Sequence, residues 1–439
     1  MLKFGDTYLK FGDAYLSGYK IPTYNVILQQ STGGTISASP LSGHRNTEVT
    51  LSNTPNEDYI FKGYEISGSN LYNTNKFKFE ESDVTAHAKW YKNPNPLNLP
   101  PYTIRLKYQN GSTPYFPKGT GVQVSQNPNV WDLTYNNSDW NYLLRPSGNL
   151  FLIEVLGANT SGVENMDFTF NLCTYLSSVQ LFDTSNVTSM SGMFNRCSNI
   201  KTLPLFDTSN VTSMYYMFAG CEKLTTVPKY DTSNVTHMEG MLAGCRTLSS
   251  VPLFDTHNVT DMREMFNHCY NLSSVPLFDT HNVTNMWDMF NDCTALKSIP
   301  LFDTSNVIRM ELMLHGCKSL NSVPLFDTHN VNNMRYTFGY CSALKSIPLF
   351  DTSNVTNMEG TFYGCKSIKY IPLLDTNKVT NMIDTFRDCI NVQSGALSLY
   401  QQASTQTNPP FYHGHAFDNC GTNTTQGAAE LAQIPSDWK

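Results

Sequence analysis

The hydrophobic and polar positions of this chain repeat every 24 residues, from about residue 162 to residue 392. One unit follows the consensus N-V-T-x-M-x-x-M-F-x-x-C-x-x-L-x-x-V-P-L-F-D-T-S/H and runs from Asn210 to Ser233. Counted from its valine, apolar residues fall at positions 0, 3, 6, 7 and 10, which is the spacing of one helix face. The preceding Asp-Thr-Ser/His-Asn string supplies short polar side chains that suit a helix N-cap. The pattern therefore predicts a short helix in each unit.

The second half of each unit has the pattern of a short strand. Leu, then Val or Ile, then Leu follow the cysteine in an extended segment that we expect to face the core. A proline after the Val or Ile (Pro228 in this unit) has no N–H to donate, so the strand is predicted to be only about two or three residues long. Neither element can bury its apolar side alone, but stacked turns can. We predict an α/β solenoid, a right-handed superhelix of the leucine-rich-repeat type with about ten turns.

The repeat carries a resemblance to a known family. The segment FDTSNVTSMSGMFNRCSNIKTLPLFDT resembles the BspA-type leucine-rich repeats of bacterial surface proteins and of phage tail or fibre proteins. The resemblance covers more than half of the chain. It implies a solenoid that binds host or extracellular surfaces.

A different pattern precedes the repeats. Residues 21–92 alternate apolar and polar positions with a period of two, which predicts a small all-β domain. The string GGTISASPLSGHRNTEVTLSNTPNEDYIFKGYEISG resembles the InlB-type B-repeat, a β-grasp-like module of bacterial surface proteins. That resemblance implies a spacer or adhesion role without catalysis.

The remaining segments complete the predicted domain organisation. Residues 1–20 hold a duplicated Leu-Lys-Phe-Gly-Asp string, expected to form a β-ribbon arm that docks onto another protein or packs as a hairpin on the next domain. Residues 93–101 are a proline-rich linker. We expect residues 102–160, with a helix-like stretch at 139–144, to cap the solenoid of residues 161–392. Residues 393–439 resemble the C-terminal cap of phage-encoded relatives. The first residues lack a signal-peptide pattern, so export by the general secretory route is not expected.

Composition narrows the function classes. Charged residues are only 15% of the chain and the net charge is −7, which argues against a nucleic-acid-binding protein. No run of about 18 apolar residues exists, so no membrane span is predicted. Ten of the eleven cysteines lie 24 residues apart on the apolar face. We interpret them as a ladder of buried thiols rather than as disulfides or a zinc site, because no C-x-x-C pair occurs. They include Cys197, Cys221, Cys245 and Cys269.

An aspartate and a neighbouring serine or histidine also recur in each unit. Stacked carboxylates could bind Ca²⁺, but the glycine-rich calcium motif is missing, which favours carboxylates that accept backbone N–H bonds at the corner. His257, His281 and His329 share one position. The adjacent pair could bind a metal, but serine fills this position elsewhere, which favours a capping or solvated role. We predict no metal or cofactor. The aspartates include Asp207, Asp231, Asp255 and Asp279.

The two positions after the first methionine of each unit vary while the frame stays fixed. Because they lie off the apolar face, we expect them to project to solvent. Exposed aromatic and arginine side chains in a row resemble a recognition surface. The alternatives are ordinary surface variation and packing against a partner subunit. The candidate receptor-binding residues are Tyr215, Tyr216, Arg263, Trp287, Arg335 and Tyr336.

No known catalytic motif occurs in the sequence. We therefore expect a non-enzymatic phage virion appendage, a tail-fibre or other surface protein that contacts a host glycan or protein through the solenoid. The arm would attach it to other virion proteins, and a homo-oligomer is possible. The alternative is a bacterial cell-surface adhesin of the BspA-like family. A third possibility is a depolymerase carried on the fibre.

Overall fold

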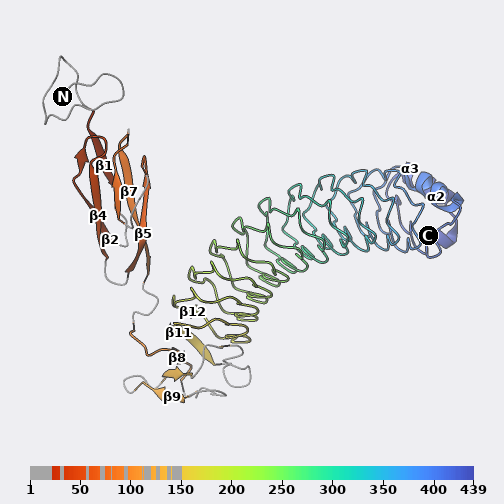
Figure 1. Cartoon of the computed structure of the whole chain (residues 1–439). Helices are drawn as coiled ribbons and strands as arrows, with labels where there is room; N and C mark the ends of the chain where they lie inside the picture. The colour runs from red at the N-terminus through yellow and green to blue at the C-terminus, as the bar shows by residue number, and fades with distance from the viewer. Residues whose placement is uncertain are drawn as a thin grey trace, which may run out of the picture. The chain divides into compact units, whose positions relative to one another are not determined.

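The computed structural model describes residues 22–29, 34–55, 59–69, 75–80, 82–92, 97–110, 112, 120–124, 129–135, 140 and 151–439. The chain divides into two compact units, Met1–Pro96 and Leu97–Lys439 (Figure 1). The predicted docking arm at 1–20 lies outside the described residues. So does the predicted helical stretch at 139–144, apart from Trp140. No described helix is long and apolar enough to cross a membrane.

The first unit consists of two β-sheets. Its four-stranded sheet has the order β3-β1-β7-β5, in which only the β1–β7 pair is parallel. The second sheet has the order β2-β4-β6. The strands are β1 (Tyr24–Gln29), β2 (Gly34–Ser39), β3 (Ser42–Gly43), β4 (Glu48–Pro55), β5 (Tyr59–Ser67), β6 (Lys76–Lys78) and β7 (Val84–Lys92).

Alternating residues of both sheets build the core of this unit. Val49, Leu51 and Phe77 from one sheet and Val84 and Ala86 from the other are fully buried in one cluster. The period-two pattern thus produces two sheets that pack face to face. No helix lies among the described residues of this unit.

A five-stranded sheet begins the second unit. Its order is β12-β11-β8-β10-β9, and β11 pairs antiparallel with β8 but parallel with β12 of the first repeat. Ile104, Leu106 and Leu133 belong to the same buried cluster as the repeats. The sheet therefore covers an apolar end that a solenoid would otherwise expose. Its strands are β8 (Thr103–Tyr108), β9 (Thr120–Gln123), β10 (Val130–Thr134), β11 (Leu152–Asn159) and β12 (Ser178–Val179).

The repeats contain no helices, so the predicted helix of each unit, and with it the α part of the α/β class, is wrong for described residues 161–392. Isolated parallel bridges join one residue per unit to its equivalent in the next, such as Ser213 to His237 and His237 to Asp261. The stacked turns follow an arc in Figure 1 that ends at α2 and α3. The chain is thus a repeat solenoid built from turns.

The hydrogen bonds of one unit show why a helix does not form. In the segment from Met214 to Cys221, alternate N–H groups point in different directions. One set donates to carbonyls of the next turn, such as Met214 N to His237 O at 2.9 Å. The other set donates three residues back, such as Cys221 N to Phe218 O at 3.0 Å. Tyr216 has a φ of 50°, which an α-helix excludes.

The predicted apolar face is nevertheless the buried one. All five apolar positions of the unit are fully buried, and the phenylalanines stack along the axis, with Phe194 and Phe218 ring centroids 6.1 Å apart. A chain of tight turns places about every third residue inward, as a helix does, so the two give similar patterns. The five positions in this unit are Val211, Met214, Met217, Phe218 and Cys221.

The predicted strand after the cysteine is also absent from most units. Among described residues 161–392, only β12 is a strand, and all bridges except that of Tyr370 with Ser394 involve the last residue of the Asn-Val-Thr-x segment or its equivalent. In the segment after the cysteine, the valine or isoleucine side chains point inward as predicted, but the leucine after the proline does not. Seven such leucines are 51–64% exposed: Leu205, Leu253, Leu277, Leu301, Leu325, Leu349 and Leu373.

Two helices close the other end of the solenoid. They are α2 (Ala396–Thr405) and α3 (Thr425–Gln433), followed by a 3₁₀ turn at Ser436–Trp438. The Trp438 ring is buried and stacks on the His413 ring at 4.3 Å. The backbone N–H of Phe417 donates to the carbonyl of Trp438 at 3.0 Å, which ties this cap to the last turns.

Candidate functional site

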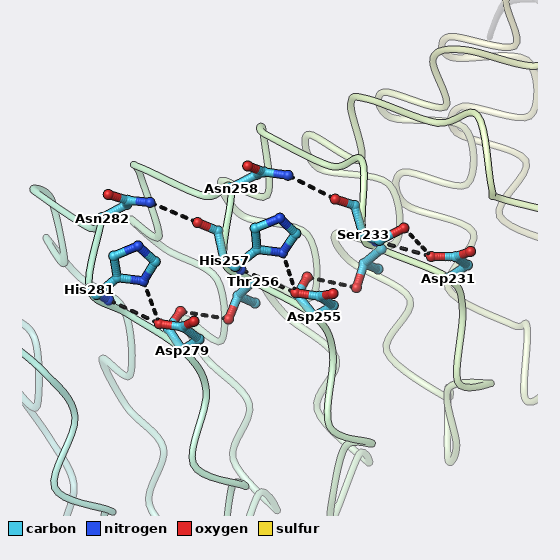
Figure 2. A network of polar contacts seen from close by, with 10 residues as sticks. Asp231, Ser233, Asp255, Thr256, His257, Asn258, Asp279, His281 and Asn282 are labelled. Atoms are coloured by element: carbon cyan, nitrogen blue, oxygen red, sulfur yellow. Dashed lines mark hydrogen bonds and ion pairs between the residues drawn. The ribbon is translucent and has the colours of Figure 1, made fainter.

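The Asp-Thr-Ser/His-Asn string forms a corner of every turn (Figure 2). Asp231 Oδ1 accepts the backbone N–H of Ser233 at 3.0 Å and its hydroxyl at 2.7 Å. Asp255 Oδ1 accepts the backbone N–H of His257 at 3.3 Å and lies 2.6 Å from its Nδ1. Asp279 does the same with His281. These carboxylates therefore shape the corner, which is the arrangement the capping interpretation describes.

Threonine and asparagine link each corner to its neighbours. The Thr256 hydroxyl donates to the carbonyl of Asp279 in the next turn at 2.7 Å. The Asn258 amide donates to the carbonyl of Ser233 in the preceding turn at 2.8 Å. One hydrogen bond forward and one back in each turn hold the corners in register along the solenoid, as Figure 2 shows.

The corner bonds also set the charge of this edge. The hydrogen bonds from the His257 side chain and backbone lower the pKa of Asp255, and those from His281 lower the pKa of Asp279. Hydrogen bonds from Ser305 lower the pKa of Asp303 in the same way. These three carboxylates therefore stay ionised to a lower pH than a free aspartate does. Among the described residues, no group of three or more His, Cys, Asp or Glu side chains is placed to hold a metal ion.

The cysteines lie inside the solenoid as free thiols. All eleven are buried, including Cys197, Cys221, Cys245 and Cys269. The Cys221 thiol donates to the carbonyl of Phe194 in the preceding turn at 3.2 Å. Burial raises the pKa of Cys221 to about 12. These thiols are packing groups, and the nine from Cys197 to Cys389 each donate one weak hydrogen bond of this kind.

The six candidate receptor-binding residues do not form the fully exposed row that we expected. Tyr215 and Arg335 are exposed, whereas Arg263 and Trp287 are half-buried. Tyr216 and Tyr336, one position later, are also half-buried. Glu239 and Glu311 at the first position and Asp288 at the second are buried. The expectation that both positions project to solvent is therefore wrong.

The reason is the left-handed backbone at the second position. It directs the Tyr216 ring along the solenoid axis, over Gly240 of the next turn, where a Cβ atom would lie 2.5 Å from the ring. The Tyr216 hydroxyl donates to the Glu264 carboxylate two turns away. Burial and this hydrogen bond raise the pKa of Tyr216. A signal for this was present in the sequence: an aromatic residue is followed 24 residues later by glycine, here and at Tyr336 and Gly360.

The arginines of the row are held by neighbouring groups. Arg263 lies 3.4 Å from the Asp261 carboxylate, and Arg335 lies 3.2 Å from Glu359 and over the Tyr336 ring at 5.1 Å. These contacts fix the directions of side chains that remain partly accessible. The row is a preorganised surface of aromatic and basic groups.

Comparisons with known proteins agree with the repeat pattern. Residues 149–253, 249–347 and 341–427 match the family described as "Mycoplasma protein of unknown function, DUF285". The chain belongs to the DUF285 family. Residues 24–94 match the divergent InlB B-repeat domain. The resemblance to BspA-type repeats and to the B-repeat is thereby confirmed.

Solved structures similar to this DUF285 chain are distant. A leucine-rich repeat protein from Eubacterium ventriosum ATCC 27560 is 15% identical with a TM-score of 0.32, covering 72% of this chain and 95% of its own. The plant peptide hormone receptor RGFR1 in complex with RGF2 is 11% identical with a TM-score of 0.27, covering 52% of this chain and 41% of its own. No curated protein matches the chain.

The DUF285 repeats also bring together an aromatic cluster that sequence analysis missed. His315 lies 5.8 Å from the Tyr336 ring and 5.4 Å from Tyr340, and Tyr340 lies 4.7 Å from Tyr363. Arg387 is 5.8 Å from the Tyr363 ring centroid. Equivalent side chains are one or two turns apart in space but 24 or 48 residues apart in sequence. Tyr340 is exposed, so this cluster extends the row of candidate residues toward the C-terminal cap.

Proposed function

We propose that this protein is a non-enzymatic surface protein that uses its solenoid to contact a bacterial host, as a tail-fibre or other appendage on a phage virion. The receptor is a glycan or protein of the host envelope. In this proposal the repeats form a right-handed superhelix of about ten turns. Residues 1–20 would join the appendage to other virion proteins. Weak contacts would gain strength from many copies or from a homo-oligomer.

One observation carries this proposal: a rigid frame presents aromatic and arginine side chains in a line. Hydrogen bonds between turns fix the backbone at each unit, so Tyr215, Arg263, Trp287 and Arg335 occupy equivalent places on turns that are one or two units apart. Side chains held in place lose little entropy when a partner binds. Tyr, Trp and Arg are also the residues that contribute most at recognition surfaces.

A bacterial cell-surface adhesin is the second candidate. The match of residues 24–94 to the B-repeat domain favours it, because modules of that kind resemble those of bacterial surface proteins. The binding surface would be the same in both cases. The two candidates differ in whether a phage particle or a bacterial cell carries the protein.

Binding to host cells and to isolated envelope glycans tests the surface. The double variant Arg263→Ala/Trp287→Ala should weaken binding at least about tenfold while keeping the melting temperature, because both side chains are partly exposed. The matched control is Arg246→Ala/Leu301→Ala, which removes an exposed arginine and an exposed leucine away from the row. Equal binding by both double variants would refute the proposed surface.

Immunolabelling of purified virions and of producing cells tests the location. Label on the particles supports the appendage. Label on the cell envelope of cells that release no phage supports the adhesin. Loss of glycan mass on incubation with the protein would instead indicate a depolymerase.

A further inference from the structure

Two histidines occupy the same corner position on adjacent turns. His257 Nδ1 lies 2.6 Å from Asp255 Oδ1, and His281 Nδ1 lies 2.7 Å from Asp279 Oδ1. Figure 2 shows the two imidazole rings in the same orientation, one turn apart. Their side chains are about half exposed, at 46% and 50%.

The corner itself does not require an imidazole. In the neighbouring turn the Ser233 hydroxyl makes the equivalent bond to Asp231 at 2.7 Å. What histidine adds is its second nitrogen. An ionised carboxylate can only accept, so Nδ1 carries the hydrogen, and in the neutral ring Nε2 keeps a free lone pair. Neither Nε2 atom has a hydrogen-bond partner among the described residues.

We propose that His257 and His281 together bind one divalent transition-metal ion, such as Zn²⁺ or Ni²⁺, between their Nε2 atoms. Parallel-paired residues on adjacent turns are about 4.8 Å apart. Two nitrogens on one tetrahedral ion lie about 3.4 Å apart, so the exposed rings need only tilt toward each other. Water completes the coordination. Asp255 and Asp279 orient the rings, as carboxylates behind metal-bound histidines commonly do.

The charge of this edge favours a cation. Asp255, Asp279 and Asp303 lie on successive turns, and the first two contact the rings directly through Nδ1. Imidazole ligands select zinc, copper or nickel over calcium and magnesium.

The chain contains its own control. His329 makes the same bond to Asp327, at 2.6 Å, but Ser305 and Ser353 occupy the corner on the turns before and after it. It therefore presents one Nε2 atom without a neighbour. If metal binding requires two histidines on adjacent turns, His329 should contribute little to it.

Titration calorimetry of the full chain with NiCl₂, in a buffer that does not chelate, tests the site. We expect one Ni²⁺ per chain, and an affinity at least about tenfold lower in His257→Ser and in His281→Ser, because each variant removes one arm of a two-point attachment. His329→Ser should bind as the unchanged chain does. Serine is the native corner residue of other turns, so these variants keep the corner bond.

A gain of binding provides the second arm of the test. Ser305→His places an imidazole between His281 and His329 and should raise the stoichiometry to two ions per chain. An equal loss of affinity in all three serine variants would show independent single histidines and overturn the proposal. So would unchanged binding in His257→Ser and His281→Ser, or no gain in Ser305→His. None of these measurements depends on host binding.

Discussion

At the scale of single residues, the glycines of the repeat have a specific role beside aromatic residues. Gly240 has a φ of +58° and lies under the Tyr216 ring, and Gly360 lies in the same way under Tyr336. Any side chain at these positions would meet both a strained backbone and an aromatic ring. An aromatic side chain at this position therefore packs on a glycine at the same position of the next turn, and this contact couples the two turns.

The substitution Gly240→Ala should lower the free energy of unfolding by about 2 kcal/mol or more, from strain and overpacking together. Adding Tyr216→Ala should recover the part due to the ring but not the part due to φ. Gly414→Ala is the matched control, since nothing lies within 4 Å of its added Cβ and its φ is not positive. Urea denaturation measures all three. A loss in the control as large as that in Gly240→Ala would contradict this account.

The buried thiols give a second prediction at this scale. Burial raises the pKa of Cys221 and of Cys269 from 9.0 to about 12. The raised pKa stabilises the fold fully below pH 9. Above it the unfolded chain ionises first, so the free energy of unfolding should fall as pH rises from 9 to 12.

Thiol labelling at pH 8 provides the direct measurement. No cysteine of the native chain should react quickly with a thiol reagent, whereas all eleven should react after denaturation. Rapid labelling of the native protein would show that the ladder is accessible.

At the scale of the element, one turn of the solenoid is stabilised mainly by its neighbours. The corner hydroxyl of Thr256 is buried and donates forward, and Asn258 donates back. The carbonyl of His257 between them accepts a hydrogen bond from the Asn282 amide of the next turn. A single turn therefore has no stable structure of its own, as expected for a repeat architecture.

Thr256→Val should lower the free energy of unfolding by about 1–3 kcal/mol, because it removes the hydrogen bond of a buried hydroxyl to the carbonyl of Asp279 while keeping the shape. Thr256→Ser should restore most of that loss. The exposed Thr260→Val in the same turn should change stability little. Chemical denaturation of the three variants measures these changes in the free energy of unfolding. An equal effect of both valine substitutions would show that the corner hydrogen bond is unimportant.

At the scale of the whole molecule, the second unit has one continuous core with a different cover at each end. The β8–β11 sheet shares that core at the first turn, and α2, α3 and Trp438 share it at the last. Because each turn contacts mainly its neighbours, damage to one end should remain local.

Trp438→Ala should lower the local stability of the C-terminal cap by about 3–5 kcal/mol, since it empties a buried site against Phe417 and His413. Hydrogen exchange should rise in the last turns and stay unchanged around Cys221. Phe411→Ala, which removes a ring that is 78% exposed, is the control. A uniform rise in exchange along the whole solenoid would mean that it unfolds as one unit.

The sequence by itself determined the period, the stacking of turns, the buried positions such as Met214 and Cys221, and the corner role of the aspartates. These follow from side-chain polarity, which the pattern records directly. Only the tertiary structure decided that the Val-to-Cys segment is a chain of turns, because its N–H partners lie 23 residues away. The same holds for Tyr216 over Gly240 and for the exposed leucines such as Leu301. Their surroundings are supplied by adjacent turns and not by neighbours in the chain.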